Sequence, residues 1–174
     1  MILISNHLTQ IEQFKNLEDV VIRINMAHVK DKAELEKFVD VPFDIFLDYP
    51  KGRSKPPVPT LHIPDAIEMM NKYKNIKYFA VSNIQTNSET EMIISTLPEG
   101  VSFVPKIETW FGIIKLDKIL KNNPIKYIML DSEDLYTTVF NDQELFLNLK
   151  ERAGKTCKNN NVTMLELHGV IFKG

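Results

Sequence analysis

The sequence lacks several features that mark whole classes of protein. Cys157 is the one cysteine among 174 residues, so no internal disulfide can form. No apolar stretch approaches the roughly 18 residues that a membrane span needs. The first residues carry no basic stretch followed by an apolar run and a small-residue cleavage site. These absences predict a cytoplasmic protein that has no contact with a membrane.

A surplus of positive charge is also missing. The chain has 21 Lys and Arg against 23 Asp and Glu, which gives a net charge of −2. Sequence-independent binding to nucleic acid depends on neutralising phosphates with basic residues, so this balance disfavours a nucleic-acid partner. A hydrophobic fraction of 44% with 25% charged residues is that of an ordinary globular protein. The length predicts a single domain over residues 1–174.

Glycine is scarce, with 6 residues, and the usual phosphate-binding loops are absent. The chain contains neither G-x-G-x-x-G after a strand nor G-x-x-x-x-G-K-[ST], which argues against dinucleotide and P-loop folds. The single cysteine lies in the stretch KTCKNNN. We interpret Cys157 as part of a solvated helix end and not as a nucleophile, because no histidine lies near it in sequence.

Short apolar runs rich in β-branched residues alternate with longer amphipathic stretches. Seven runs read as strands: ILIS (2–5), VVIRIN (20–25), FDIFLD (43–48), KYFAVS (77–82), SFVPKIE (102–108), KYIMLD (126–131) and VTMLEL (162–167). Helices are expected at 10–17, 32–38, 64–73, 88–97, 111–120 and 142–158, with Ser88 and Asn141 or Asp142 as caps and Pro64 in a first turn.

Apolar strands separated by helices predict an α/β fold with a parallel sheet covered on both faces. An open doubly wound sheet and a β/α barrel both fit, and the missing phosphate loops favour the barrel. A complete eight-unit barrel usually needs about 250 residues. We therefore expect a reduced or incomplete TIM-type barrel of about seven β/α units. Its first and last strands would need covering by residues 169–174 or by a second subunit, and in the second case the protein would be a homodimer.

Polar side chains close several of the predicted strands. In a β/α barrel the chemistry lies at the carboxyl ends of the strands, so these residues are the candidates for a site. Residues two apart on a strand face the same side, which pairs Arg23 with Asn25 and Lys106 with Glu108. The candidate site residues in full are Arg23, Asn25, Asp48, Ser82, Lys106, Glu108, Asp131 and Asp134.

Two of these carboxylates come from consecutive strands. Glu108 and Asp134 would lie side by side above a parallel sheet, and Mg²⁺ is typically held by one or two carboxylates plus water and substrate oxygens. Lys106 could place a positive charge beside an enolate or phosphoryl oxygen, and Arg23 has the planar fork that suits a carboxylate. The alternative is purely structural: a buried ion-pair network, with Asp134 as the N-cap of a helix that begins at Leu135.

The order of the segments VIRINMAH, FDIFLDYPKGRSK, KYFAVSNIQTNSETE, FVPKIETWFGIIKLDKIL and KYIMLDSEDL resembles the catalytic barrel of pyruvate kinase and the wider phosphoenolpyruvate/pyruvate superfamily. The resemblance implies Glu108 and Asp134 as ligands of Mg²⁺ or Mn²⁺, Lys106 as the lysine at the transferred phosphoryl group, and Arg23 as the substrate-facing arginine. It places Asn25 and Asp48 at monovalent-cation positions.

The chain departs from pyruvate kinase at informative places. Ala27 stands where that family has a serine, and the run from Ser132 to Leu135 replaces R-G-D-L. About a dozen residues, PKGRSKPPVPTLH, occupy the place of the domain that closes over ATP. These departures argue against phosphoryl transfer to a nucleotide.

The run KIET…G…SEDL is similar to the I-E-T-x-x-G and G-x-E-D-L segments of the citrate lyase β-subunit and HpcH/HpaI aldolase branch. That resemblance implies a divalent metal beneath a pyruvate-type enolate. Two predicted strands separate Arg23 from Lys106 in sequence, which is the order of pyruvate kinase, whereas one is expected for the lyase branch.

We therefore expect an Mg²⁺- or Mn²⁺-dependent enzyme that acts through the enolate of a small 2-oxo acid or of a phosphoenolpyruvate-like substrate. Glu108 and Asp134 would hold the metal, Lys106 and Arg23 would be catalytic, and the substrate would contact Asn25, Asp48, Ser82 and Asp131. A reduced phosphotransferase that uses phosphoenolpyruvate and a degenerate barrel that serves as a binding or scaffold subunit are the alternatives.

Overall fold

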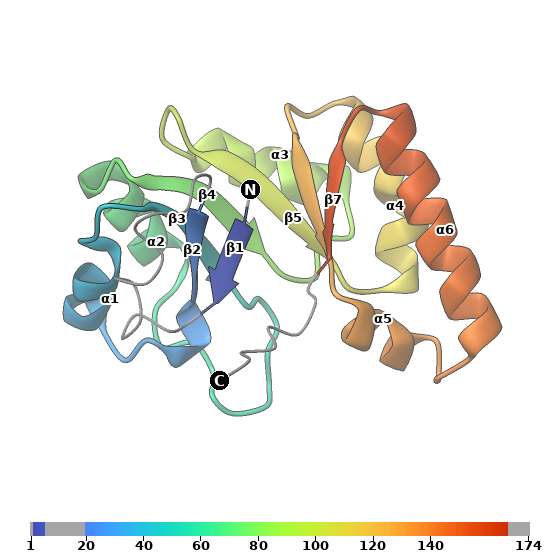
Figure 1. The fold of residues 1–174 in the computed structure, drawn as a ribbon, viewed down its shortest axis with the longest axis horizontal. Coiled ribbons are helices and arrows are strands. Elements are labelled where there is room, and N and C mark those ends of the chain that lie inside the picture. The colour runs from blue at the N-terminus through green and yellow to red at the C-terminus, as the bar shows by residue number, and fades with distance from the viewer. Residues whose placement is uncertain (1, 6–19, 167–174) are drawn as a thin grey trace. The chain divides into compact units, whose positions relative to one another are not determined.

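The computed structural model describes residues 2–5 and 20–166. The described chain forms two compact units (Figure 1). Unit 1 contains residues 2–5, 20–82 and 93–103, and unit 2 contains residues 83–92 and 104–166. Helix α3, Asn87–Thr96, and strand β5, Ser102–Ile107, contribute residues to both units.

Unit 1 is built on four parallel strands that pair in chain order. They are β1 (Ile2–Ser5), β2 (Val20–Asn25), β3 (Asp44–Tyr49) and β4 (Ile76–Val81), joined by the short 3-10 helix η2 (Met26–His28) and by helices α1 (Lys32–Val39) and α2 (Ile63–Lys72). The residues of β3 from Ile45 to Asp48 are all buried, whichever face they occupy. Burial on both faces explains why these strands are continuous apolar runs instead of alternating ones.

Local signals set where the two helices of unit 1 begin. Asp31 caps α1 by accepting a hydrogen bond from the N–H of Glu34 at 2.8 Å. His62 occupies the N-cap of α2, Pro64 lies in its first turn, and the carboxylate of Asp65 accepts from the N–H of His62 at 2.8 Å. Proline suits a first turn because its missing N–H would have no helical partner there.

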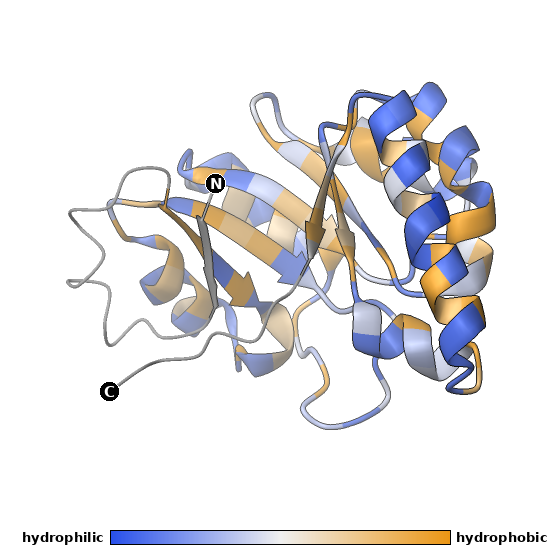
Figure 2. Ribbon diagram, turned by 45° about the vertical axis from the view of Figure 1, so that its right-hand side comes forward, coloured by the Kyte–Doolittle hydropathy of each residue, from blue (hydrophilic) through white to orange (hydrophobic). Residues whose placement is uncertain are grey.

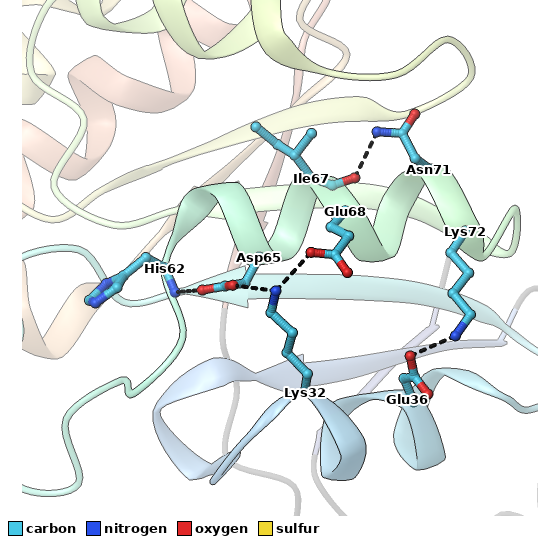
Figure 3. A network of polar contacts seen from close by, with 8 residues as sticks. All are labelled: Lys32, Glu36, His62, Asp65, Ile67, Glu68, Asn71 and Lys72. Atoms are coloured by element: carbon cyan, nitrogen blue, oxygen red, sulfur yellow. Dashed lines mark hydrogen bonds and ion pairs between the residues drawn. The ribbon is translucent and has the colours of Figure 1, made fainter.

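Charged side chains join α1 to α2 on the surface (Figure 3). Lys32 Nζ lies 2.9 Å from Asp65 and 2.7 Å from Glu68, and Lys72 Nζ lies 2.6 Å from Glu36. Such exposed pairs add little stability, because water screens them. The two helices are therefore held to the sheet mainly by their buried apolar faces, which include Leu35, Ala66 and Met69.

Unit 2 is built on three parallel strands, again in chain order. Residues 106–107 of β5 pair with β6 (Tyr127–Leu130), and β6 pairs with β7 (Thr163–Glu166). The helices are α4 (Trp110–Lys121), α5 (Ser132–Thr138) and α6 (Gln143–Asn159). Helix α6 packs against α4 and β7 and is striped in hydropathy (Figure 2). It buries Leu149, Ala153 and Cys157, which follow the helical spacing of four residues.

The seven predicted strands are all present, with ends within one or two residues of those expected. Five predicted helices correspond to α1, α2, α3, α4 and α6, whereas the helix expected at 10–17 lies outside the described residues. Parallel strands in chain order, alternating with helices, are consistent with a reduced β/α barrel. Pyruvate-kinase-like detail in that barrel stays a prediction, as do the single domain over 1–174 and the homodimer.

Two local expectations differ from the structure. Ser88 does not cap α3; the hydroxyl of Thr86 accepts from the N–H of Glu89 at 3.3 Å instead. The short helix that the structural alternative began at Leu135 is α5, which begins at Ser132. Asp142 does cap α6, as expected, accepting from the N–H of Leu145 at 3.0 Å.

Among the described helices, none combines the length and the apolar character that crossing a bilayer requires.

Candidate metal centre at the ends of two strands

Lys106 and Glu108 lie at the carboxyl end of β5 and form a buried ion pair. Lys106 Nζ is 3.0 Å from Glu108 Oε1, and the two residues are 5% and 4% exposed. The prediction that residues two apart on this strand share one side is confirmed. The following residue, Thr109, begins α4 as its N-cap, accepting a hydrogen bond from the N–H of Gly112 at 3.1 Å. Glu108 is thus fixed between the last strand residue and a helix cap.

Asp131 and Asp134 follow β6 in the same way. Asp131 is the N-cap of α5, and its Oδ1 accepts from the N–H of Asp134 at 3.3 Å. The N–H of Asp131 donates to the carbonyl of Ile107 at 3.3 Å, which ties the end of β6 to the end of β5. The alternative that Asp134 caps a helix beginning at Leu135 is therefore wrong, because the helix begins at Ser132 and Asp131 caps it.

These three carboxylates converge. One ligand oxygen from each of Glu108, Asp131 and Asp134 lies within 4.8 Å of the other two. Glu108 is buried, Asp131 is half-buried and Asp134 is exposed, so the cluster opens to solvent on one side. Like charges this close repel one another unless a cation or a proton neutralises them.

The donor set fits a hard divalent cation. Mg²⁺ is bound through carboxylate oxygens and keeps water or substrate oxygens in its remaining positions, so a cluster with one open side suits it. No sulfur or imidazole ligand belongs to the cluster, which disfavours the softer transition metals.

Sequence reasoning placed Asp131 in the substrate-binding group, whereas the structure brings it beside the two predicted metal ligands. The signal that could have found it was its position. Asp131 closes the run KYIMLD and precedes Asp134 by three residues, the spacing of an N-cap and the N–H that it accepts from. A capping carboxylate at the end of a strand faces the same edge as the ligands.

The other candidates lie in unit 1. Both Nε and Nη2 of Arg23 donate to Oδ2 of Asp48, Nε at 2.9 Å, and the two residues are 9% and 0% exposed. Asn25 Oδ1 accepts from the N–H of Ala27 at 3.0 Å and so caps η2. Ser82 is buried, and its N–H donates to the carbonyl of Tyr49 at 3.0 Å. The catalytic role predicted for Arg23 and the substrate contacts predicted for the other three stay predictions.

The Lys- and Asn-rich surroundings of Cys157 predicted a solvated helix end, and that prediction was wrong. Cys157 is 2% exposed on the inner face of α6, and burial raises the pKa of its thiol to about 11. A thiol with this pKa is almost entirely protonated at neutral pH, so it is a poor nucleophile. Cys157 is therefore not a candidate nucleophile, and the carboxylates and Lys106 remain the candidate site residues of unit 2.

Comparison with known proteins supports the fold. Neither a protein-family model nor a curated protein sequence matches the chain. Among solved structures, a citrate lyase from Burkholderia xenovorans LB400 matches 98% of this chain and 65% of its own with a TM-score of 0.78 and 9% identity. An HpcH/HpaI aldolase/citrate lyase family protein from Burkholderia cenocepacia J2315 matches 96% and 79%, with a TM-score of 0.69 and 11% identity.

A third structure was solved with ligands. The citrate lyase β-subunit from M. tuberculosis, complexed with oxaloacetate and magnesium, matches 94% of this chain and 76% of its own, with a TM-score of 0.64 and 11% identity. These structures belong to the HpcH/HpaI aldolase/citrate lyase family, part of the phosphoenolpyruvate/pyruvate superfamily. At sequence identities this low, the structural matches establish a shared fold and nothing about the reaction.

Proposed function

We propose that the chain is a divalent-metal-dependent lyase or aldolase that makes or breaks a carbon–carbon bond next to a small 2-oxo acid. The observation that carries this proposal is the convergence of Glu108, Asp131 and Asp134 at the ends of β5 and β6. Support comes from the fold, which the chain shares with the citrate lyase β-subunit solved with oxaloacetate and magnesium. The resemblance of KIET and SEDL to segments of that branch supports a metal-binding role for the same two carboxylates, Glu108 and Asp134.

Mg²⁺ or Mn²⁺ bound to these carboxylates would supply Lewis acidity toward the oxygens of the 2-oxo acid. The side chains provide the rest. Glu108 and Asp134 anchor the cation, and Asp131, with one oxygen occupied in capping α5, adds a third negative charge. The buried ammonium of Lys106 is a fixed positive charge that stabilises the negative charge developing on substrate oxygens as the bond breaks. Because Lys106 is buried and held by Glu108, its charge needs no rearrangement during the reaction, which makes it effective.

A reduced phosphotransferase and a non-catalytic scaffold remain the alternatives, and the metal site discriminates between them. Titration of the purified protein with Mn²⁺ by calorimetry, with and without oxalate as an enolate mimic, is the direct test. We expect saturable binding of Mn²⁺, tighter with oxalate. Exchange of the methyl protons of pyruvate in D₂O, followed by ¹H NMR, then tests enolisation.

Glu108→Gln should abolish Mn²⁺ binding, since it removes the buried carboxylate of the cluster. Glu91→Gln is the matched control, because Glu91 is a helical residue of unit 2 whose carboxylate accepts from Asn87 at 2.8 Å, outside the cluster. Equal Mn²⁺ binding by wild type and Glu108→Gln contradicts the proposed site. Binding of metal and oxalate without proton exchange would favour the scaffold.

A further inference from the structure

The segment that follows β4 donates two successive N–H groups to the end of β5. The N–H of Asn83 donates to Oε2 of Glu108 at 3.0 Å, and the N–H of Ile84 donates to the carbonyl of Lys106 at 3.2 Å. Lys106 Nζ lies 3.0 Å from the other carboxylate oxygen, Oε1. The carboxylate of Glu108 is therefore held at both oxygens by groups of unit 2, a charged side chain on one and a backbone amide on the other.

This arrangement depends on an uncommon backbone conformation. Asn83 has a φ of 54°, in the left-handed region that most residues with a side chain avoid. Glycine enters this region without penalty, asparagine enters it more readily than other residues, and a β-branched residue is strongly disfavoured there. The turn that sends two consecutive N–H groups to β5 thus places a requirement on the residue type at position 83.

The first turn of α4 holds this segment in place. Ile84 is completely buried, and its carbonyl oxygen would lie only 3.0 Å from a Cβ added at Gly112. The same Cβ would lie 3.2 Å from Cγ2 of Ile107. A side chain at Gly112 would have to push back the backbone of Ile84, which is bonded to Lys106. The absence of a side chain at Gly112 therefore allows the helix to close against the turn at Asn83.

We propose that Asn83 and Gly112 are positioning residues that orient the carboxylate of Glu108 for a divalent cation. This inference rests on the proposed metal site and adds to it a determinant outside the acidic cluster. Groups that hold a metal ligand in orientation typically change metal affinity about 10–100-fold when they are lost. Asn83 acts through its backbone N–H, which no substitution removes except proline, so the effect of a substitution depends on whether φ stays positive.

The test compares Mn²⁺ dissociation constants of three variants by calorimetry or by electron paramagnetic resonance. Asn83→Gly removes the amide side chain and keeps the left-handed turn, so its affinity should stay within about twofold of wild type. Asn83→Val should bind Mn²⁺ about tenfold more weakly, and Asn83→Ala should fall between the two. Thermal unfolding followed by circular dichroism identifies the variants that are folded. If Asn83→Val does not fold, the order of Asn83→Gly and Asn83→Ala carries the test.

Loss of affinity in Asn83→Gly equal to that in Asn83→Ala would overturn the inference, since the backbone would not be the determinant. Gly112→Ala provides an independent arm: it leaves Asn83 in place and should weaken Mn²⁺ binding by about tenfold through displacement of Ile84. Glu108→Gln tests the metal site separately from the positioning role of Asn83 and Gly112. Unchanged binding in Glu108→Gln refutes the metal site itself, whereas loss there with wild-type affinity in Asn83→Val and Gly112→Ala refutes only the positioning role.

Discussion

Each unit buries a pair of opposite charges at the carboxyl end of a strand, and the two pairs differ in what surrounds them. In unit 1 Arg23 pairs with Asp48. In unit 2 Lys106 pairs with Glu108, and Asp131 and Asp134 converge on the same carboxylate. Carboxylate oxygens that lie within 4.8 Å of one another are a donor set that a divalent cation takes, and among the described residues such a cluster forms at Glu108, Asp131 and Asp134. That difference directs the functional proposal to unit 2.

The largest expected effect comes from breaking the pair in unit 1. Arg23→Met leaves the fully buried Asp48 without its arginine, and removal of one partner of a buried ion pair typically costs about 3–5 kcal/mol. We therefore expect the free energy of unfolding in urea to fall by about 3 kcal/mol or more.

The double variant Arg23→Met with Asp48→Leu is the matched control. Replacement of a whole buried pair by apolar residues is often neutral, so it should regain most of the loss. A loss of stability below about 1 kcal/mol in Arg23→Met would show that Asp48 is neutralised in another way.

In unit 2 a single capping carboxylate should matter to the cation and not to the fold. Asparagine caps helices as well as aspartate does, so Asp131→Asn should change the free energy of unfolding by less than about 0.5 kcal/mol. It removes one charge of the cluster, and we expect Mn²⁺ to bind about tenfold more weakly. Calorimetric titration and urea unfolding measure the two effects separately.

Asp142→Asn makes the same change at the N-cap of α6, outside the cluster, and should leave Mn²⁺ affinity unaltered. Equal affinity for Mn²⁺ in the Asp131 and Asp142 variants would mean that Asp131 caps α5 and does not contribute to metal binding. The cluster would then consist of Glu108 and Asp134, the two ligands expected from the sequence.

Much of this contrast could be predicted from the sequence. The strands are easy to recognise because burial on both faces makes them continuous apolar runs. A spacing of two residues is enough to put Lys106 and Glu108 on one side. The convergence of Glu108 with Asp134 follows from parallel strands in consecutive order. These inferences depend on short-range geometry, which a sequence encodes directly.

The remaining features depend on contacts that a sequence pattern does not specify. The pairing of Arg23 with Asp48 joins two strands, and either residue could have faced a ligand instead. The hydrogen bond from Asn83 to Glu108 depends on one dihedral angle and on the packing of Ile84 beneath Gly112. Cys157 was misplaced because its neighbours in sequence are polar, although its helical neighbours four residues apart are apolar.

The smallest expected effect concerns a carboxylate of unit 1 that lies near the surface. The N–H of His62, and then Lys32, hold the pKa of Asp65 below its ordinary value (Figure 3). A lowered pKa in the folded state means that ionised Asp65 adds stability above the unfolded pKa of about 3.9, and that this stability disappears as the pH falls through the lower folded value. Because Asp65 is partly exposed and screened by water, we expect Asp65→Asn to cost at most about 1 kcal/mol at pH 7.

Urea unfolding of wild type and Asp65→Asn at pH 7, 5 and 3.5 measures this effect. The difference in the free energy of unfolding between the two proteins should narrow at the lowest pH, as the wild-type carboxyl becomes protonated. Glu68→Gln, which removes the other carboxylate that Lys32 contacts and leaves the cap of α2 intact, is the control. If this difference in the free energy of unfolding does not change with pH, it arises from packing and not from the charge of Asp65. Mn²⁺ should leave this difference in the free energy of unfolding unchanged, because Asp65 is paired with Lys32 and His62. Asp65 also lies outside the cluster of carboxylates that converge on Glu108.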